Sequence, residues 1–281
     1  MTRRYTQLAW AAAVCTYLLI ILGAIVRITG SGLGCGDHWP LCNGRLLPPL
    51  DLPTLIEYGH RLAAALVVVL VGTLVAYASW FNRWVARGER GGRLPTTSAY
   101  LALCLLLLQV ALGAITVKTG LTPTMVVLHL ATAMLLLAAL LAATQVGRLG
   151  WPTPVAAVPV VLGFVTVLLG ALTANLGAAM ACLGFPLCNG QLSASNALES
   201  VHWAHRLLAY TLATYVTLWA LGTHRRSLLL LLGLVAVQVM IGAAMVLLAL
   251  PGPLQAAHVA VGAALWAGLV LVALDRRSQP S

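Results

Sequence analysis

The pentapeptide Pro-Leu-Cys-Asn-Gly occurs twice in this chain, at residues 40–44 and again at residues 186–190. Further matched residues lie on both sides of it, in the same order in the two halves. They are Gly23-Ala24 and Gly170-Ala171, Cys35 and Cys182, His60-Arg61 and His205-Arg206, Gln109 and Gln238, and His129 and His258. A repeat of this length predicts two copies of one structural unit, residues 1–146 and residues 147–281.

The composition is that of a protein whose surroundings are lipid. Of the 281 residues, 61% are hydrophobic and 8% are charged, whereas an average soluble domain has about 25% charged residues. Eight apolar runs reach the length of about 20 residues that a membrane-spanning helix needs. They lie at about 7–28, 57–80, 97–117, 122–145, 154–175, 199–222, 226–248 and 254–274.

These runs predict an all-α integral membrane protein with eight transmembrane helices, arranged as two tandem four-helix bundles. Since each half contains an even number of helices, both halves enter the membrane in the same direction. The two bundles would then be related by a pseudo-twofold axis along the membrane normal. We interpret the first run, which begins near Leu8, as a retained helix and not as a signal peptide, because no small-residue cleavage site follows it.

The net charge of +10 does not indicate nucleic-acid binding, because the basic residues form no stripe and lie in short segments between the apolar runs. Most of the 16 Lys and Arg residues lie on the side that holds both termini. By the positive-inside rule, this side is the cytoplasm. The two longest connections, residues 29–56 and 176–198, would therefore lie on the outer face of a bacterial inner (plasma) membrane.

Four of the six cysteines lie in these two outer loops, on the oxidising side of the membrane. Three pairings of Cys35, Cys42, Cys182 and Cys188 are possible. We favour Cys35–Cys42 and Cys182–Cys188, because these pairs close the shortest loops and need no contact between the halves. The spacings do not fit a reactive Cys-x-x-Cys pair, which argues against a thiol–disulfide oxidoreductase.

Four histidines fall at matched places in the predicted helices: His60 and His129 in the first half, and His205 and His258 in the second. Each half thus places two imidazoles near the outer face at similar depth, where an ionisable side chain indicates a function. A lone histidine is better explained as a helix cap or a partner of a neighbouring carbonyl. A pair that occurs twice favours haem, whose iron takes two axial imidazoles. Zinc or copper fits less well, because no acidic or thiol ligand recurs beside the pairs.

The two halves differ beside these histidines. Glu57 precedes His60 by one helical turn, and its matching residue is His202, while Arg27 is matched by Ala174. A carboxylate beside a cofactor can act as a base or stabilise a developing cation, which would make the first half the reaction site and the second a redox helper. Glu57 is also explained as an acidic residue favoured at a helix N-terminus, and His202 as an interfacial histidine.

Arg61 and Arg206 each follow a matched histidine directly. An arginine pairs well with a haem propionate. It is equally well explained by a guanidinium that reaches the membrane surface while its stem stays in lipid. The sequence leaves both explanations open.

With these residues in view, the chain resembles the bacterial, eight-helix type of haem A synthase. The likeness extends over essentially the whole length. It is most specific in three segments: Gly-Cys-Gly-Asp-His-Trp-Pro-Leu-Cys-Asn-Gly at 34–44, Glu-Tyr-Gly-His-Arg at 57–61, and His-Trp-Ala-His-Arg at 202–206.

The resemblance implies an enzyme that oxidises the C8 methyl group of haem o to the formyl group of haem a. The route would be successive hydroxylations with water-derived oxygen, followed by dehydration of a geminal diol. Glu57 would be the catalytic carboxylate, and His205 and His258 would ligate the iron of a haem b cofactor. The substrate haem o would be bound by Arg61 and Arg27, with its iron between His60 and His129. The two cysteine pairs would be disulfides.

The resemblance further implies membrane lipid as the surroundings, and haem o synthase and cytochrome oxidase assembly factors as partners; an oligomer is compatible with it. The alternative function is a bis-haem b-type membrane cytochrome that acts only in electron transfer. Both predicted haem sites lie near the same face, which serves electron transfer across the membrane poorly.

Overall fold

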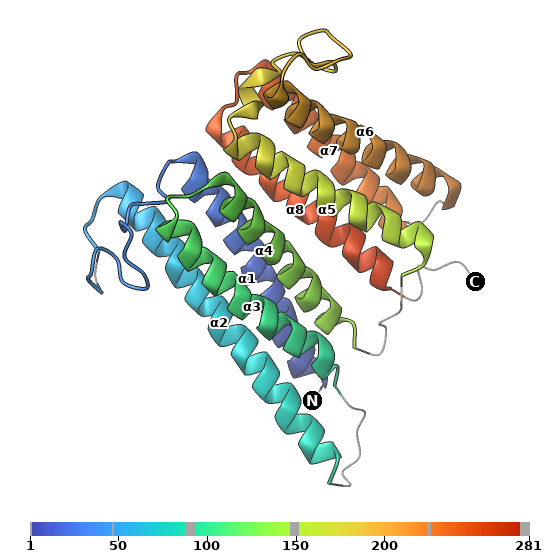
Figure 1. The fold of residues 1–281 in the computed structure, drawn as a ribbon. Helices are drawn as coiled ribbons and strands as arrows, with labels where there is room; N and C mark the ends of the chain where they lie inside the picture. The colour runs from blue at the N-terminus through green and yellow to red at the C-terminus, as the bar shows by residue number, and fades with distance from the viewer. Residues whose placement is uncertain (1, 47, 88–93, 147–151, 224–225, 276–281) are drawn as a thin grey trace. The chain divides into compact units, whose positions relative to one another are not determined.

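The computed structural model of the protein describes residues 2–46, 48–87, 94–146, 152–223 and 226–275. Within them the chain forms eight α-helices, one short 3-10 helix and no β-strand (Figure 1). They are α1 (Thr2–Ile28), α2 (Leu52–Val85), α3 (Thr96–Lys118), α4 (Pro123–Thr144), α5 (Pro154–Asn175), η1 (Ala178–Ala181), α6 (Ala197–Thr223), α7 (Arg226–Leu247) and α8 (Gly252–Leu274). The prediction of an all-α fold is confirmed for the described residues, and each predicted apolar run coincides with a helix.

Seven helices in the described part of the chain are long and apolar enough to cross a membrane. The remaining one, α6, has sufficient length, but its first turns carry Glu199, His202, His205 and Arg206. Helices also expose large apolar side chains, among them Val69 of α2 and Leu230 of α7, as a lipid-facing surface does. Length and composition therefore support a multi-pass membrane protein.

The sidedness of the termini and loops stays a prediction. It depends in part on residues that lie outside the described ranges. These residues are Arg90, Arg93, Arg148, Arg225, Arg276 and Arg277. The loop histidine His224 also lies outside the described ranges.

Helix α2 is longer than the apolar run that predicted it, because it extends beyond that run at both ends. At its start, Asp51 caps the helix by accepting a hydrogen bond from the backbone N–H of Thr54 (3.1 Å). Pro53 lies in the first turn, where a proline costs no hydrogen bond. The helix therefore begins one and a half turns before Glu57, so that this residue and His60 lie within regular helix.

The chain forms two compact units, and each is described by itself. The first unit contains α1, α2, α3 and α4 from Thr132 onward; the second contains the opening of α4 up to Ala131, and α5 to α8 up to Ala273. Within the first unit, α1 and α3 both lie against α2. Within the second, α5 and α7 both lie against α6, and η1 packs on α5 and α6. The predicted boundary between residues 146 and 147 and the predicted pseudo-twofold axis stay predictions.

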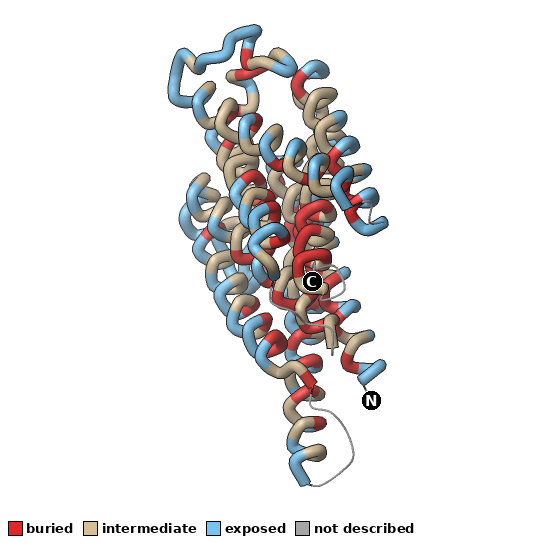
Figure 2. Tube along the Cα trace, turned by 90° about the vertical axis from the view of Figure 1, so that its right-hand side faces the viewer, coloured by how far each residue is buried: buried red, intermediate tan, exposed pale blue. Residues whose placement is uncertain are grey.

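Several helices, α2 among them, bury one side and expose the other (Figure 2). In α2 the buried apolar residues recur at helical spacing, at Val67, Val71, Leu74 and Ala78, which is the pattern of a helix packed along one stripe. In the second unit a core cluster joins α6, α7 and α8. Its members include Leu212, Val216, Ala220, Leu228, Leu231, Leu265 and Leu269.

Candidate functional site

The repeated pentapeptide forms the same turn in both loops. Asn43 and Asn189 each have a φ of 51°, in the left-handed region that asparagine tolerates better than most residues. The side chain of Asn43 donates to the carbonyl of Gly34 (3.3 Å), and that of Asn189 donates to the carbonyl of Ala181 (2.8 Å). The pentapeptide is therefore a structural motif that closes each loop on itself.

Both loops also contain a disulfide. Cys35 is bonded to Cys42, and Cys182 is bonded to Cys188. The within-loop pairing predicted from the spacing is confirmed. The two free cysteines in the described residues, Cys15 and Cys104, lie in helices.

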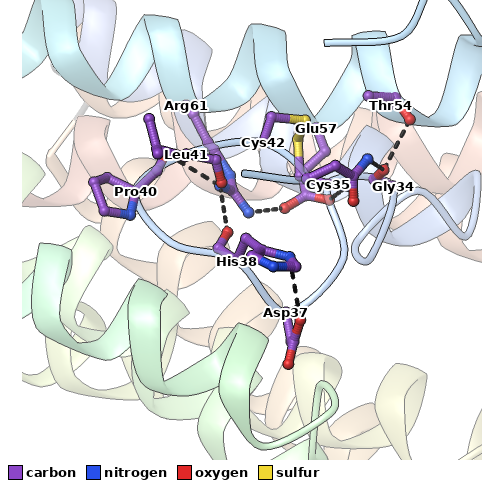
Figure 3. A network of polar contacts seen from close by, with 11 residues as sticks. Gly34, Cys35, Asp37, His38, Pro40, Leu41, Cys42, Thr54, Glu57 and Arg61 are labelled. Atoms are coloured by element: carbon purple, nitrogen blue, oxygen red, sulfur yellow. Dashed lines mark hydrogen bonds and ion pairs between the residues drawn. A yellow bond between two sulfur atoms is a disulfide. The ribbon is translucent and has the colours of Figure 1, made fainter. Parts of the chain in front are cut away.

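Glu57 of α2 lies beneath the first disulfide loop (Figure 3). Its side chain is buried, with 3% of the residue exposed. One carboxylate oxygen, Oε2, accepts the backbone N–H of Cys35 (2.8 Å), and the other, Oε1, accepts Nη2 of Arg61 (2.5 Å). Arg61 lies one turn further along α2, so this ion pair joins residues i and i+4 of one helix. Charge-assisted hydrogen bonds fix the direction of both carboxylate oxygens.

Arg61 ties the same loop to α2 through backbone carbonyls (Figure 3). Its Nη1 donates to the carbonyl oxygens of His38 (2.9 Å), Leu41 (2.9 Å) and Pro40 (3.3 Å). Propionate binding and snorkelling, the two explanations that the sequence left open, both stay predictions. Binding of the loop is a third role, which sequence reasoning missed.

Arg206 of α6 holds the second loop in the same way. Its Nη2 donates to the carbonyl of Cys182 (2.7 Å), and its Nη1 donates to those of Gly184 (2.6 Å) and Leu187 (3.0 Å). The side chain is buried, with 6% of the residue exposed. The matched arginines thus have matched structural roles.

An aromatic residue near each arginine also binds the loop. The hydroxyl of Tyr58 donates to the carbonyl of Leu46 (2.8 Å), and Nε1 of Trp203 donates to the carbonyl of Leu192 (2.9 Å). Each of these aromatic residues lies three residues before its arginine, on the same face of its helix. The two loops are therefore fixed on α2 and α6 by corresponding contacts.

His202 occupies in the second unit the position that Glu57 has in the first. It is 5% exposed, and its Nδ1 lies 3.0 Å from the carbonyl oxygen of Ala178 in η1. Since a carbonyl only accepts, the imidazole nitrogen donates. His202 is thus buried and bound to the backbone, and its place relative to the membrane interface stays a prediction.

His205 of α6 and His258 of α8 lie together in the second unit. Their ring centroids are 6.5 Å apart, and the ring planes are inclined by 74°. Nδ1 of His205 lies 2.9 Å from the carbonyl oxygen of Thr166 in α5 and therefore donates to it, which leaves Nε2 as the ring nitrogen with a free electron pair. Nδ1 of His258 is buried and has no hydrogen-bond partner among the described residues. Nε2 of His258 lies 3.2 Å from the amide nitrogen of Gln238, the glutamine matched to Gln109.

In the first unit, His60 lies on α2 with its ring against Gly23 of α1. Its Nδ1 is buried and has no hydrogen-bond partner in the part of the chain that the structure describes. Arg27 lies half-buried in the last turn of α1. His129 lies in the opening turns of α4, which group with the second unit. The pairing of His60 with His129 therefore stays a prediction.

Residues 6–270 match the family model for cytochrome oxidase assembly proteins. The chain belongs to this family. A family relative from Shouchella clausii named heme A synthase is 31% identical over 232 residues, which cover 75% of this chain and 74% of that protein. A heme A synthase from Symbiobacterium thermophilum is 45% identical over 106 residues, covering 38% of this chain and 32% of that protein. A third, from Bacillus licheniformis, is 34% identical over 146 residues, or 51% of this chain and 45% of that protein. Membership of the family confirms the resemblance to haem A synthase that the sequence motifs indicated.

Proposed function

We propose that this chain is a haem A synthase, an enzyme of haem a biosynthesis that acts in cytochrome oxidase assembly. The family and the names of the relatives support the pathway. The observation that carries the proposal within the chain is the pair of imidazoles in the second unit, His205 and His258. The two rings lie 6.5 Å apart, a distance at which both could bind one metal through bonds of about 2 Å.

The surroundings of this pair fit a haem b. The Nδ1 donor of His205 is already bound to a carbonyl, so that Nε2 is oriented for a metal. Haem held by two imidazoles supplies one-electron redox chemistry.

The first repeat, residues 1–146, is the proposed place of the substrate. We assign His60 and His129 to the iron of haem o, and Arg27 and Arg61 to its binding. The reaction is the oxidation of the C8 methyl group to a formyl group with oxygen from water, by successive hydroxylations. The net change adds one water oxygen and releases four protons and four electrons per methyl group, so the site needs a proton acceptor and the enzyme needs an external electron acceptor.

Glu57 is the proposed acceptor. It is the buried carboxylate one turn before His60, and its two hydrogen bonds hold it in one orientation. A fixed carboxylate in a buried site can accept a proton or stabilise a positive charge that develops on the substrate. The matching residue of the second unit, His202, donates to a carbonyl and carries no negative charge. This difference supports placing the chemistry in the first unit.

The pigments of the purified protein test the proposal. Extracted haem should contain haem b together with haem o or haem a, and membranes supplied with haem o should form haem a. Haem b alone, at two per chain, would instead indicate the bis-haem electron carrier. Haem o synthase and cytochrome oxidase assembly factors remain the proposed partners, and co-purification with either is the corresponding measurement.

A further inference from the structure

A glycine of the preceding helix faces three of the four matched histidines. Gly23 of α1 faces His60, Gly170 of α5 faces His205, and Gly242 of α7 faces His258. A Cβ atom built on these glycines would lie 3.2, 2.8 and 3.1 Å from Cε1 of the respective ring. Only a residue without a side chain lets each imidazole lie this close to the neighbouring helix.

Gly170 differs from the other two in what lies beside it. Thr166, whose carbonyl accepts Nδ1–H of His205, is four residues earlier in α5. In an α-helix the N–H of residue 170 also bonds the carbonyl of residue 166, and a carbonyl oxygen has two lone pairs. A side chain at position 170 would stand over the second lone pair, since its Cβ would lie 3.2 Å from Nδ1 of His205. The missing side chain therefore opens this carbonyl to the histidine.

The first unit has the glycine but not the hydrogen bond. The ring of His60 lies against Gly23, with a looser fit of 3.8 Å from the built Cβ to Nδ1. Its Nδ1 has no hydrogen-bond partner among the described residues. A metal-binding histidine whose other nitrogen is bound to a carbonyl has a fixed tautomer, a fixed ring orientation and greater basicity. His205 has these properties, and His60 lacks this bond.

We propose that Gly170 and the carbonyl of Thr166 are positioning groups that make His205 a permanently oriented ligand, whereas His60 is a ligand that can release its haem. The inference rests on the proposed function, in which the second unit keeps a cofactor haem and the first passes a haem on. A resident cofactor requires a strong, preorganised ligand. A haem that enters as substrate and leaves as product requires one that exchanges.

Gly170→Ala, with Gly23→Ala as the matched control, tests the first part of the proposal. In purified protein, Gly170→Ala should replace the low-spin spectrum of the second-unit haem by a high-spin one and lower haem affinity about 10–100-fold, the usual effect of losing such a partner. Gly23→Ala should leave the spectrum and midpoint potential of that haem unchanged. A low-spin spectrum and potential in Gly170→Ala equal to those of the wild type would overturn the inference.

A second measurement does not depend on how well an alanine is accommodated. In His205→Gly, added imidazole should restore the low-spin spectrum, and it should bind at least about tenfold more tightly than 1-methylimidazole, because only imidazole can donate to Thr166. In His60→Gly loaded with haem o, the two probes should bind within a few-fold of each other. Equal affinities of the probes in His205→Gly would contradict the proposal. Wild-type protein that holds haem b but forms no haem a would reject the proposed function alone, and these variants would still decide the inference.

Discussion

Arg61 and Arg206 bind corresponding loops, yet their guanidinium groups have different partners. Arg61 donates to the Glu57 carboxylate as well as to carbonyls. Arg206 donates to three carbonyls, and no carboxylate among the described residues forms an ion pair with it. Arg61 thus combines an ion pair within α2 with its contacts to the loop, whereas the contacts of Arg206 are to backbone carbonyls. Truncating the two arginines should therefore have different consequences.

Arg206→Ala should destabilise the second loop strongly. It removes the donors of three carbonyls, and each buried acceptor left without a partner costs about 1–3 kcal/mol. Thermal unfolding of the detergent-purified protein should move to clearly lower temperature. Arg45→Ala, at an exposed arginine of the first loop, is the control and should change little; equal unfolding temperatures for both variants would show that the loop does not depend on Arg206.

Glu57→Gln separates the chemical role of Glu57 from its structural role. The amide keeps an oxygen for the N–H of Cys35, but it has no negative charge and accepts no proton. Haem a formation should fall by about 10²-fold or more, while haem b remains bound. Glu199→Gln, which changes the acidic residue in the first turn of α6, is the matched control. Haem a production by Glu57→Gln at the wild-type rate would exclude Glu57 as the proton acceptor.

The residue types of the site could be predicted, but several of their contacts could not. The matched histidines and the cysteine pairs stand out because they recur at corresponding positions in the two halves. Glu57 stands out because it does not recur. The roles of Arg61 and Arg206 depend on three carbonyls that a turn brings to one point, and backbone carbonyls have no sequence signature. The partner of His205 is likewise a carbonyl, that of Thr166. Gly170, four residues later, belongs to a Gly-Ala pair that the sequence repeats. Its role can be recognised only when the neighbouring helix, which carries His205, is in place.

At the scale of the helices, apolar runs located the membrane segments, and local chemistry determined where they end. Helix α2 shows the difference, since it extends from Leu52 to Val85 although the apolar run covers only about 57–80. Asp51 and Pro53 are a recognisable helix start, but they lie outside the apolar run and escape a search for hydrophobicity. The site depends on these extra turns, because they place Glu57 in regular helix below the disulfide loop.

The Asp51 cap should make the start of α2 sensitive to acid. Hydrogen bonds from Thr54 hold the pKa of Asp51 below its ordinary value, so its stabilising effect is present at neutral pH and is lost as the pH falls through that lowered pKa. Asp51→Asn should keep the cap and remove this pH dependence. Asp51→Ala should lose the cap at every pH. Hydrogen exchange of the first turn of α2, measured at pH 7 and in acid, checks this; an acid dependence equal in Asp51→Asn and wild type would contradict it.

At the scale of the whole chain, the two units contain loops of the same architecture. They differ beneath the loops, where Glu57 of the first unit corresponds to His202 of the second. The seven apolar helices and the family support a membrane protein. The charges of the connecting loops predict its orientation in the membrane. The positive-inside rule predicts that both disulfide loops lie outside. Disulfides, which form on the oxidising side of a membrane, agree with that orientation.

Cysteine labelling tests the orientation. In a background with Cys15→Ala and Cys104→Ala, a membrane-impermeant thiol reagent should label Leu192→Cys, at an exposed loop residue, in intact cells. Arg87→Cys, beyond the far end of α2, should react only after the cells are opened. Labelling of Arg87→Cys in intact cells would reverse the assigned topology.

The polar start of α6 has a consequence for how the protein is made. Glu199 and Arg206, with His202 and His205 between them, make this helix a weak substrate for the translocon, because charged side chains oppose insertion at a cost that reaches about 2.5–3.5 kcal/mol at the centre of a segment. Its neighbours α5 and α7 are strongly apolar, and α6 packs against both. We expect α6 to partition into the bilayer together with α5 and α7 and not on its own, so biogenesis of the second unit is cooperative. The residues proposed to bind the cofactor would thus also set the order of events during membrane insertion.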